Sequence, residues 1–175
     1  ALYYPLQPHR AAILLARPVL PNWSARFSAI LRSYRYRIIN RSARPTLDEG
    51  RVWHVRQPLD VDLMRQAAQY LLGRHDFTTF RASACQAKSP VRTLDRLEIH
   101  REGEEIVIVT EARAFLHHQV RNMTGTLKMV GEGNWPVERV GQALAACDRR
   151  AGGPTAPAEG LYLTGVTYPE DPFAK

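Results

Sequence analysis

The chain has 175 residues, 45% of them hydrophobic and 23% charged, with a formal net charge of +7 and an isoelectric point near 9.8. A chain of this length and composition buries one sizeable core, so we predict a single domain over residues 1–175. Its longest early apolar run, residues 11–16, is far too short to span a membrane and lacks the flanks of a signal peptide. We therefore expect no membrane partner.

The positive charge comes almost entirely from arginine and gathers at the start of the chain. Eight arginines precede the first acidic residue, Asp48, at positions 10, 17, 26, 32, 35, 37, 41 and 44. Because a guanidinium binds phosphate with two parallel hydrogen bonds and stacks on bases, this excess favours a nucleic-acid partner. A proteome rich in arginine would give the same excess, and one sequence does not separate the two explanations.

Two cysteines, Cys85 and Cys147, stand alone, without the spacing of a metal site or of a disulfide framework. Lone thiols of this kind are typical of a reducing compartment, so we predict a cytoplasmic protein without a metal. The sequence does not begin with Met, and its opening residues, ALYYPLQPHR, are typical of the interior of a protein. We therefore expect a fragment of a longer chain.

Three strands are predicted in the first third of the chain. Residues 11–18 are short and apolar, which is typical of a strand, although a brief helix would also fit. Residues 27–40 alternate as a half-buried strand does, and residues 52–57 predict a short strand. In the alternating strand one face carries Tyr34, Tyr36 and Ile38, and the other carries Arg35, Arg37 and Ile39. Tyrosines facing a core and arginines facing water are the commoner explanation; a surface that stacks bases and neutralises phosphates is the alternative.

Asp60 is a good N-cap for a helix over residues 61–72, with Gly73 in the C-cap position. The face expected to be buried carries Leu63, Ala67, Tyr70 and Leu71. The adjacent His75 and Asp76 admit an acid–base interpretation, but a turn held by the aspartate side chain is the commoner explanation. In the small, polar loop that follows, Lys88 and Arg92 flank Pro90 and are candidates for phosphate contacts.

A hairpin and a helix follow. Residues 92–100 and 104–113 both alternate, and the glycine-containing turn at residues 101–103 joins them. Residues 115–131, FLHHQVRNMTGTLKMVG, then place Leu116, Val120, Met123, Leu127 and Val130 on one stripe of a helix. A flank away from this stripe carries His117, Arg121, Thr124 and Lys128. From periodicity alone these are most often solvated side chains of an outer face.

The last third of the chain predicts one more helix and one more strand. Pro136 opens a helix over residues 137–147, with Val140, Leu144 and Cys147 facing inward. Residues 161–168 alternate and are apolar, so we expect a strand in the centre of the sheet. About five strands and three helices, with antiparallel neighbours and long crossovers, predict an α+β fold.

Four strings resemble, in the right order, the motifs of tRNA pseudouridine synthases of the A family. The string FLHHQVRNMTG (115–125) is similar to the family's Phe-Leu-x-x-Met-Val-Arg-x-x-x-Gly motif, and Arg121 stands at its arginine. The other strings are FSAILRSYRYRI (27–38), LLGRHDFTTFRA (71–82) and TAPAEGLYLTGVTYP (155–169). Together they take in residues 24–169, most of the chain.

The resemblance implies a pseudouridine synthase-like α+β fold, with a mostly antiparallel sheet and about three helices packed on it. It also implies a tRNA partner and an isomerase that breaks a uridine's glycosidic bond, rotates the uracil and rejoins it through carbon. Family members need no cofactor, form homodimers and modify uridines on the 3′ side of the anticodon stem-loop. Which uridines would be modified here is left open.

The resemblance assigns roles to particular residues. Tyr34, the first tyrosine of the family's Arg-x-Tyr-x-Tyr pattern, would lie against the target uridine and use its hydroxyl for proton transfer. Arg121 would pair with the catalytic aspartate, and Leu161 would line the uracil pocket. The substrate-binding residues we predict are Tyr34, Leu161, Arg32, Arg35 and Lys128.

One departure from the family pattern matters most. The family carries its catalytic aspartate in an upstream Arg-Thr-Asp-x-Gly-Val-His string, and these 175 residues contain no such string. The aspartates that are present, Asp48, Asp60, Asp62 and Asp76, have a different context. Gln119 is a smaller departure, since the family usually has Met there. We therefore predict that the isolated chain is inactive.

Two hypotheses stay open. The chain is either the C-terminal portion of a tRNA pseudouridine synthase that lacks the upstream part with the catalytic aspartate, or a non-catalytic RNA-binding module derived from that family.

Overall fold

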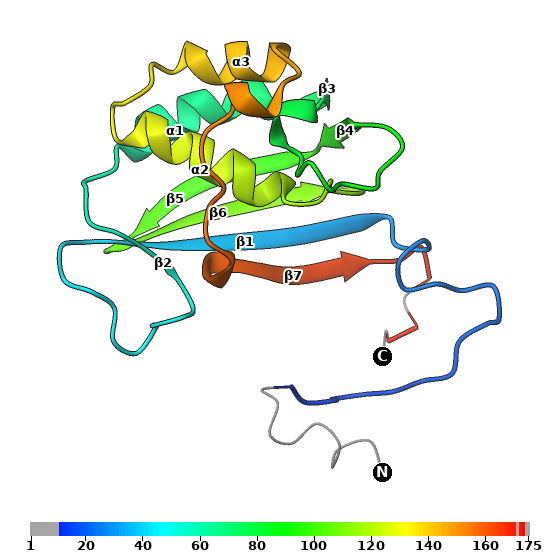
Figure 1. The fold of residues 1–175 in the computed structure, drawn as a ribbon. Helices are drawn as coiled ribbons and strands as arrows, with labels where there is room; N and C mark the ends of the chain where they lie inside the picture. The colour runs from blue at the N-terminus through cyan, green and yellow to red at the C-terminus, as the bar shows by residue number, and fades with distance from the viewer. Residues whose placement is uncertain (1–10, 171, 174–175) are drawn as a thin grey trace.

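The structure is a computed structural model that describes residues 11–170 and 172–173, in which helices cover one face of a β-sheet (Figure 1). The opening residues 1–10 lie outside the described part. The strands are β1 (Leu31–Asn40), β2 (Trp53–Val55), β3 (Gly73–Asp76), β4 (Val91–Leu94), β5 (Arg96–Glu102), β6 (Glu105–Ala112) and β7 (Leu161–Thr167). The α-helices are α1 (Val61–Ala68), α2 (Gln119–Gly131) and α3 (Glu138–Ala145). The predicted α+β class, with a mostly antiparallel sheet and three helices, is confirmed.

Strand β1 organises the main sheet. It pairs along one side with β6, antiparallel, from Arg32 opposite Ala112 to Ile39 opposite Glu105. Its other side is shared, because β7 pairs antiparallel with its first half and β2 pairs parallel with its last three residues. The main path of the sheet is therefore β2-β1-β6-β5, with β7 beside β2 on β1.

The predicted central position of the last strand is wrong. Among the described residues β7 pairs only with β1, so it is an edge strand. Leu163 in its middle is 56% exposed. No residue of β7 is fully buried, and an alternating sequence is equally compatible with an edge strand.

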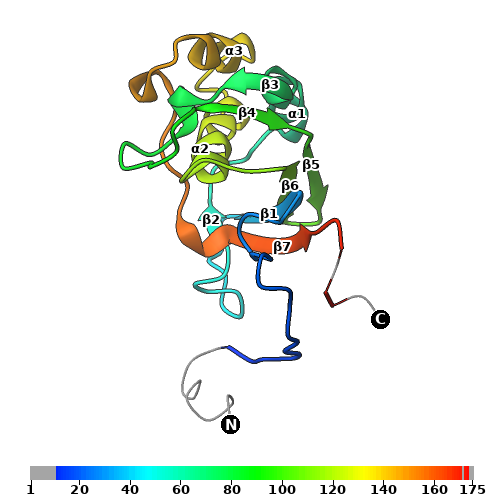
Figure 2. The same ribbon diagram turned by 90° about the vertical axis from the view of Figure 1, so that its right-hand side faces the viewer.

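The predicted hairpin is confirmed as β5 and β6, with its turn slightly later than expected. Glu102 pairs with Glu105, so the turn is Gly103-Glu104, and Gly103 takes the positive φ of 62° that such a tight turn requires. The expected first strand divides at Asp95. Its first part, β4, leaves the main sheet and pairs with β3 in a separate two-stranded sheet (Figure 2).

Helix α1 begins where the sequence predicts and ends earlier. The Asp60 side chain accepts hydrogen bonds from the backbone N–H groups of Asp62 and Leu63, at 2.9 and 3.0 Å. The helix ends at Ala68 and continues only as a 3₁₀ turn over residues 69–71. Tyr70, expected to face inward, is 41% exposed because the tighter turn rotates it outward.

Two further local predictions have clear outcomes. The Asp76 side chain accepts a hydrogen bond from the N–H of Thr78 at 2.8 Å, so the predicted aspartate turn is confirmed. Cys147 is exposed, contrary to its predicted inward orientation. Helix α3 ends at Ala145, and Cys147 lies beyond it in a left-handed conformation with φ of 47°, which turns its side chain off the helix face.

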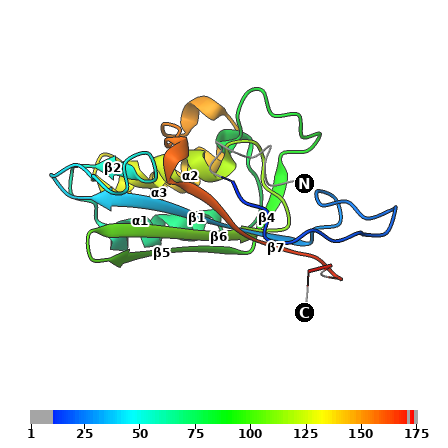
Figure 3. The same cartoon turned by 90° about the horizontal axis from the view of Figure 1, so that it is seen from below.

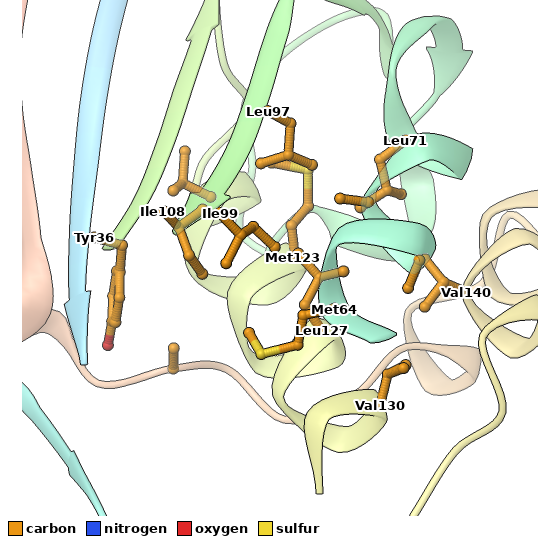
Figure 4. Close-up of a cluster of buried hydrophobic side chains, with 14 of the residues drawn as sticks. Tyr36, Met64, Leu71, Leu97, Ile99, Ile108, Met123, Leu127, Val130 and Val140 are labelled. Carbon is orange, nitrogen blue, oxygen red and sulfur yellow. The ribbon is translucent and has the colours of Figure 1, made fainter. Parts of the chain in front are cut away.

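The predicted apolar stripe of α2 is the centre of the core. Met123, Leu127 and Val130 are fully buried in one cluster with Met64 of α1 and Ile108 of β6 (Figure 4). Deletion of a buried side chain of this size costs about 2 to 5 kcal/mol, so this contact between helix and sheet carries much of the stability.

The flank of α2 is less exposed than its sequence predicts. Thr124 is only 1% exposed, because residues 153–156 run across the helix. A Cβ on Gly125 would lie 1.8 Å from the Pro154 carbonyl oxygen, so glycine is required for this close approach. The segment also brings its backbone within hydrogen-bonding distance of Arg121.

The strand predicted at residues 11–18 is wrong. These residues have no regular secondary structure and are exposed, including the apolar side chains of Ile13, Leu14 and Leu15. A short apolar run forms a strand only where a neighbour supplies hydrogen bonds, and no described strand pairs with it. Among the described residues, no helix has the length and apolar character needed to cross a membrane.

Candidate active site

A pocket of about 460 Å³ lies between β1, the beginning of α2 and the beginning of β7. Tyr34, Arg121 and Leu161, which are far apart in the sequence, all line it. Its volume is within the usual range for small-ligand sites. No aspartate or glutamate is among its lining residues in the described part of the chain.

Tyr34 lines the pocket from the face of β1 that carries the helices. It lies opposite Thr110 of β6 and Leu163 of β7, at the point where the register between β1 and β7 shifts. Its ring meets that of Phe115 edge-on, with ring centroids 5.2 Å apart. This packing fixes the ring and leaves it half-buried at the pocket wall.

Arg121 is held in one orientation by two contacts. Its Nε donates to the Ala156 carbonyl oxygen at 2.6 Å, and the N–H of Ala156 donates to the Arg121 carbonyl oxygen at 3.1 Å. Its Nη1 lies 3.1 Å from Nε2 of His118. No ion pair joins Arg121 to a carboxylate within the described residues. The pocket therefore contains an oriented cation whose charge is not neutralised.

A tight turn delivers the chain into α2, and the sequence pattern missed it. The Gln119 N–H donates to the Leu116 carbonyl at 3.0 Å, while the Gln119 side-chain oxygen accepts from the Leu116 N–H at 2.8 Å. His118 lies between them with φ of 63°, as the third position of a type II turn requires. The helix thus begins at Gln119 instead of Phe115. The glutamine three residues after Leu116, a capping-box spacing, was the available signal.

Gln119 and Tyr36 are buried polar groups beside the pocket. Nε2 of Gln119 is buried and has no hydrogen-bond partner among the described residues. The Tyr36 hydroxyl donates to the Pro157 carbonyl at 2.6 Å, and burial raises the pKa of Tyr36 well above its ordinary value, with a smaller opposing effect from Arg121. Tyr36 therefore stays neutral and acts as a structural link to residues 155–160.

The structure separates the other predicted substrate-binding residues. Arg32 lies next to the pocket, where its guanidinium donates to the carbonyl oxygens of Arg26 and Arg113. Arg35 lies on the opposite face of the sheet, and its Nη2 is 3.5 Å from carboxylate oxygens of both Glu102 and Glu105. Of Arg32 and Arg35, only Arg32 lines a cavity that Tyr34 also lines.

Lys128 is also directed away from the pocket. Its Nζ lies 2.5 Å from a carboxylate oxygen of Glu132, the residue that follows α2. The same ammonium lies 5.8 Å from the ring centroid of Trp53. Lys128 thus links α2 to β2 and does not line the pocket.

Two further cavities adjoin the pocket and extend it into a trough. One of about 700 Å³ shares Tyr34, Phe115 and His117 with the pocket, and the next, of about 500 Å³, shares Arg32 and Arg92 with the second. We call this surface the arginine trough, and the arginines that line it are Arg26, Arg32, Arg74, Arg92, Arg113 and Arg121. The sequence predicted Arg92 here, whereas Lys88 does not line it.

A thiol in the trough, Cys85, has a lowered pKa. Burial opposes ionisation of Cys85, yet backbone hydrogen bonds involving Ala87 and His117 and the charges of Arg81 and Arg92 together lower the pKa of the Cys85 thiol. None of the trough arginines forms an ion pair with a described carboxylate. In the described part of the chain, no group of three or more His, Cys, Asp or Glu residues could hold a metal ion.

An α+β fold with an unneutralised arginine trough that leads to a pocket defines a protein suited to a polyanion such as RNA. The sequence profile of the tRNA pseudouridine synthase family matches residues 67–169. The chain belongs to this family.

Relatives named tRNA pseudouridine synthase A match nearly the whole chain. The relative from Gluconobacter oxydans is 64% identical over 170 residues, which is 97% of this chain and 62% of that protein. The relative from Acidiphilium cryptum is 63% identical over all of this chain and 69% of its own length, and that from Rhodospirillum centenum is 58% identical over 96% of this chain and 69% of its own. The chain thus spans about two thirds of the length of these relatives.

Proposed function

We propose that this chain forms the base-binding part of an enzyme that converts uridine to pseudouridine in tRNA. The observation that supports the proposal best is the convergence of Tyr34, Arg121 and Leu161 on one pocket with no carboxylate among its described lining residues. The family motifs assign a role to each of these three residues. The group that the described lining of the pocket lacks is a carboxylate, and the motif with the family's catalytic aspartate is the one that these 175 residues lack.

Each residue has chemistry to contribute. A carboxylate from outside this chain would enter beside Arg121, whose guanidinium would keep it ionised and would fix its direction through paired hydrogen bonds. The carboxylate would act as the nucleophile while the N–C glycosidic bond breaks, and it would leave again when the new C–C bond forms. Tyr34 would pack on the uracil and accept or relay the proton that leaves C5, and Leu161 would supply an apolar wall.

The arginine trough supplies the path for RNA. A uridine in a folded tRNA reaches this pocket only if it is turned out of its stack, and the flanking phosphates must then be held. Arg92 and Arg113 line the trough away from the pocket without acidic partners among the described residues, so their charge is available to phosphates. We propose the tRNA anticodon stem-loop as the substrate, a homodimer as the assembly and the cytoplasm as the location.

The proposal is tested by comparing this chain with a longer form in which an upstream segment carrying the family's aspartate motif precedes it, here called the full-length protein. Release of tritium from C5-labelled uridine in tRNA measures turnover. We expect release by the full-length protein and none by residues 1–175 alone. Turnover by the isolated chain would overturn the assignment of the nucleophile to another segment. Binding of tRNA without turnover by the full-length protein would support the non-catalytic RNA-binding module instead.

A further inference from the structure

The contact between His118 and Arg121 fixes the protonation state of the histidine. Both nitrogens at the end of a guanidinium are donors only, so Nε2 of His118, 3.1 Å from Nη1 of Arg121, must be the acceptor. An imidazole accepts at Nε2 only when it is neutral and carries its proton on Nδ1. The geometry therefore requires one tautomer of one charge state.

The backbone conformation that places the His118 ring is energetically unfavourable. His118 has φ of 63° and ψ of 6°, a left-handed conformation that is unfavourable for a residue with a side chain. The two hydrogen bonds between Leu116 and Gln119 close the turn around it. Glycine or asparagine would satisfy the turn with less strain. A histidine held in this conformation while its ring meets a functional arginine indicates that the ring has a use there.

Burial and the neighbouring positive groups favour the neutral form of the His118 ring. Burial, His117 and Arg121 each lower the pKa of His118, in that order. The His117 ring lies 4.0 Å away between centroids, and Arg26 and Tyr34 line the same pocket. Tyr36, on the core side, is neutral, and Glu159 beyond it is exposed. A proton on His118 would thus add a positive charge among arginines.

We infer that His118 is a positioning residue that holds the Arg121 guanidinium toward the pocket. This inference rests on the proposed function, because the orientation of Arg121 matters for turnover only if Arg121 pairs with a catalytic carboxylate. As pH falls, protonation of His118 removes the acceptor and repels Arg121. Turnover should therefore fall as pH drops through the pKa of His118, which lies below the ordinary value of 6.5.

Two variants of the full-length protein separate positioning from folding. His118→Gly relieves the backbone and removes the acceptor, so it should fold at least as stably as wild type while kcat falls between about tenfold and a hundredfold and KM for tRNA stays within about twofold. His118→Asn tolerates the same backbone and offers a side-chain oxygen, so it should recover part of kcat. The acid limb of the kcat profile should move to lower pH in both. His100→Asn, on the opposite face of the sheet, is the control and should leave kcat and its pH profile unchanged.

A second measurement does not depend on turnover. Long-range ¹H–¹⁵N spectra of the histidine rings should show His118 as the Nδ1-protonated tautomer at pH 7. An Nε2-protonated ring, or a His118→Gly variant with wild-type kcat and an unchanged acid limb, overturns the inference while the proposed function stands. Absence of turnover in the wild-type full-length protein overturns the proposed function, and the positioning role falls with it.

Discussion

The two faces of the sheet carry arginines in opposite electrostatic states. On the face without helices, Arg37 forms two hydrogen bonds with the carboxylate of Glu105, at 2.7 and 2.8 Å, and Arg96 pairs with Glu98 and Glu111. From below, β1 and β6 lie side by side in front of the helices (Figure 3). On the other face, Arg32 and Arg121 bond to carbonyl oxygens and to His118, with no carboxylate partner among the described residues.

The difference shows where positive charge is available to a ligand. An arginine that is paired with glutamate contributes to the fold, and its charge is cancelled at short range. An arginine that bonds to a carbonyl oxygen is equally well fixed but keeps its whole charge. Neighbouring positions on one strand, such as Tyr34 and Arg35, therefore lie in different electrostatic surroundings because successive side chains point to opposite faces.

The largest expected effect comes from changing arginine to lysine, a conservative change that should act differently on the two kinds of arginine. In the full-length protein, Arg121→Lys should lower kcat by about a hundredfold or more, because lysine cannot hold a carboxylate with two parallel hydrogen bonds. It should cost only about 1 kcal/mol of stability, from the lost bond to the Ala156 carbonyl. Tritium release and urea unfolding measure the two quantities.

Arg37→Lys is the matched change on the face of the sheet without helices, which we call the open face. It should lower stability by about 1 to 2 kcal/mol through its weakened contact with Glu105 and leave the kcat of the folded protein unchanged. If Arg121→Lys instead loses stability and keeps its turnover, the two faces do not differ as described.

The next prediction concerns two tyrosines on the same face of β1. Tyr34→Phe should keep the fold and most of the tRNA affinity while kcat falls about a hundredfold, since the ring still packs and only the hydroxyl is lost. Tyr36→Phe should lower the thermal stability and leave kcat unchanged, because the Tyr36 hydroxyl bonds to the Pro157 carbonyl away from the pocket. Kinetics and thermal unfolding of both variants decide; equal turnover in Tyr34→Phe and wild type would reduce Tyr34 to a packing residue.

A third prediction tests the trough through salt dependence. Replacement of both Arg92 and Arg113 with Gln should weaken tRNA binding about tenfold at low salt and should lower the slope of log affinity against log salt by roughly one per lost phosphate contact. Replacement of Arg35 and Arg96 with Gln removes the same charge from the open face. It should change neither the tRNA affinity nor the slope by more than about twofold. Equal effects of the two pairs would show that net charge, and not the trough, attracts the RNA.

Sequence patterns predicted the parts of the fold that depend on local periodicity. The stripe of α2, the hairpin and the Asp60 cap follow from side-chain spacing and from capping chemistry, and all three are confirmed. The edge position of β7 and the exposure of residues 11–18 depend on which strand lies beside which. That pairing is a long-range property that a single segment does not encode.

The candidate site shows the same division. The motif identified Tyr34, Arg121 and Leu161, and the structure brings them to one pocket. Arg35 and Lys128 were chosen for their charge, and no local pattern announces the carboxylates of Glu102, Glu105 and Glu132 that meet them. The turn at His118 was missed because its left-handed backbone interrupts an otherwise helical spacing.

The smallest expected effect is an acid sensitivity that comes from the pair of Arg37 and Glu105 on the open face. The hydrogen bond from Arg37 holds the pKa of Glu105 below its ordinary value of 4.5, so the unfolded chain binds the proton more readily than the folded one. This stabilisation is complete above about pH 4.5 and is lost as pH falls through the lowered pKa. Glu105→Gln should therefore flatten the dependence of the urea midpoint on pH below 4.5, whereas Glu98→Gln, whose ion pair is exposed, should flatten it less. No aspartate or glutamate is among the described residues that line the pocket. An acid sensitivity that survives Glu105→Gln undiminished would show that another group titrates and that the pair of Arg37 and Glu105 does not cause it.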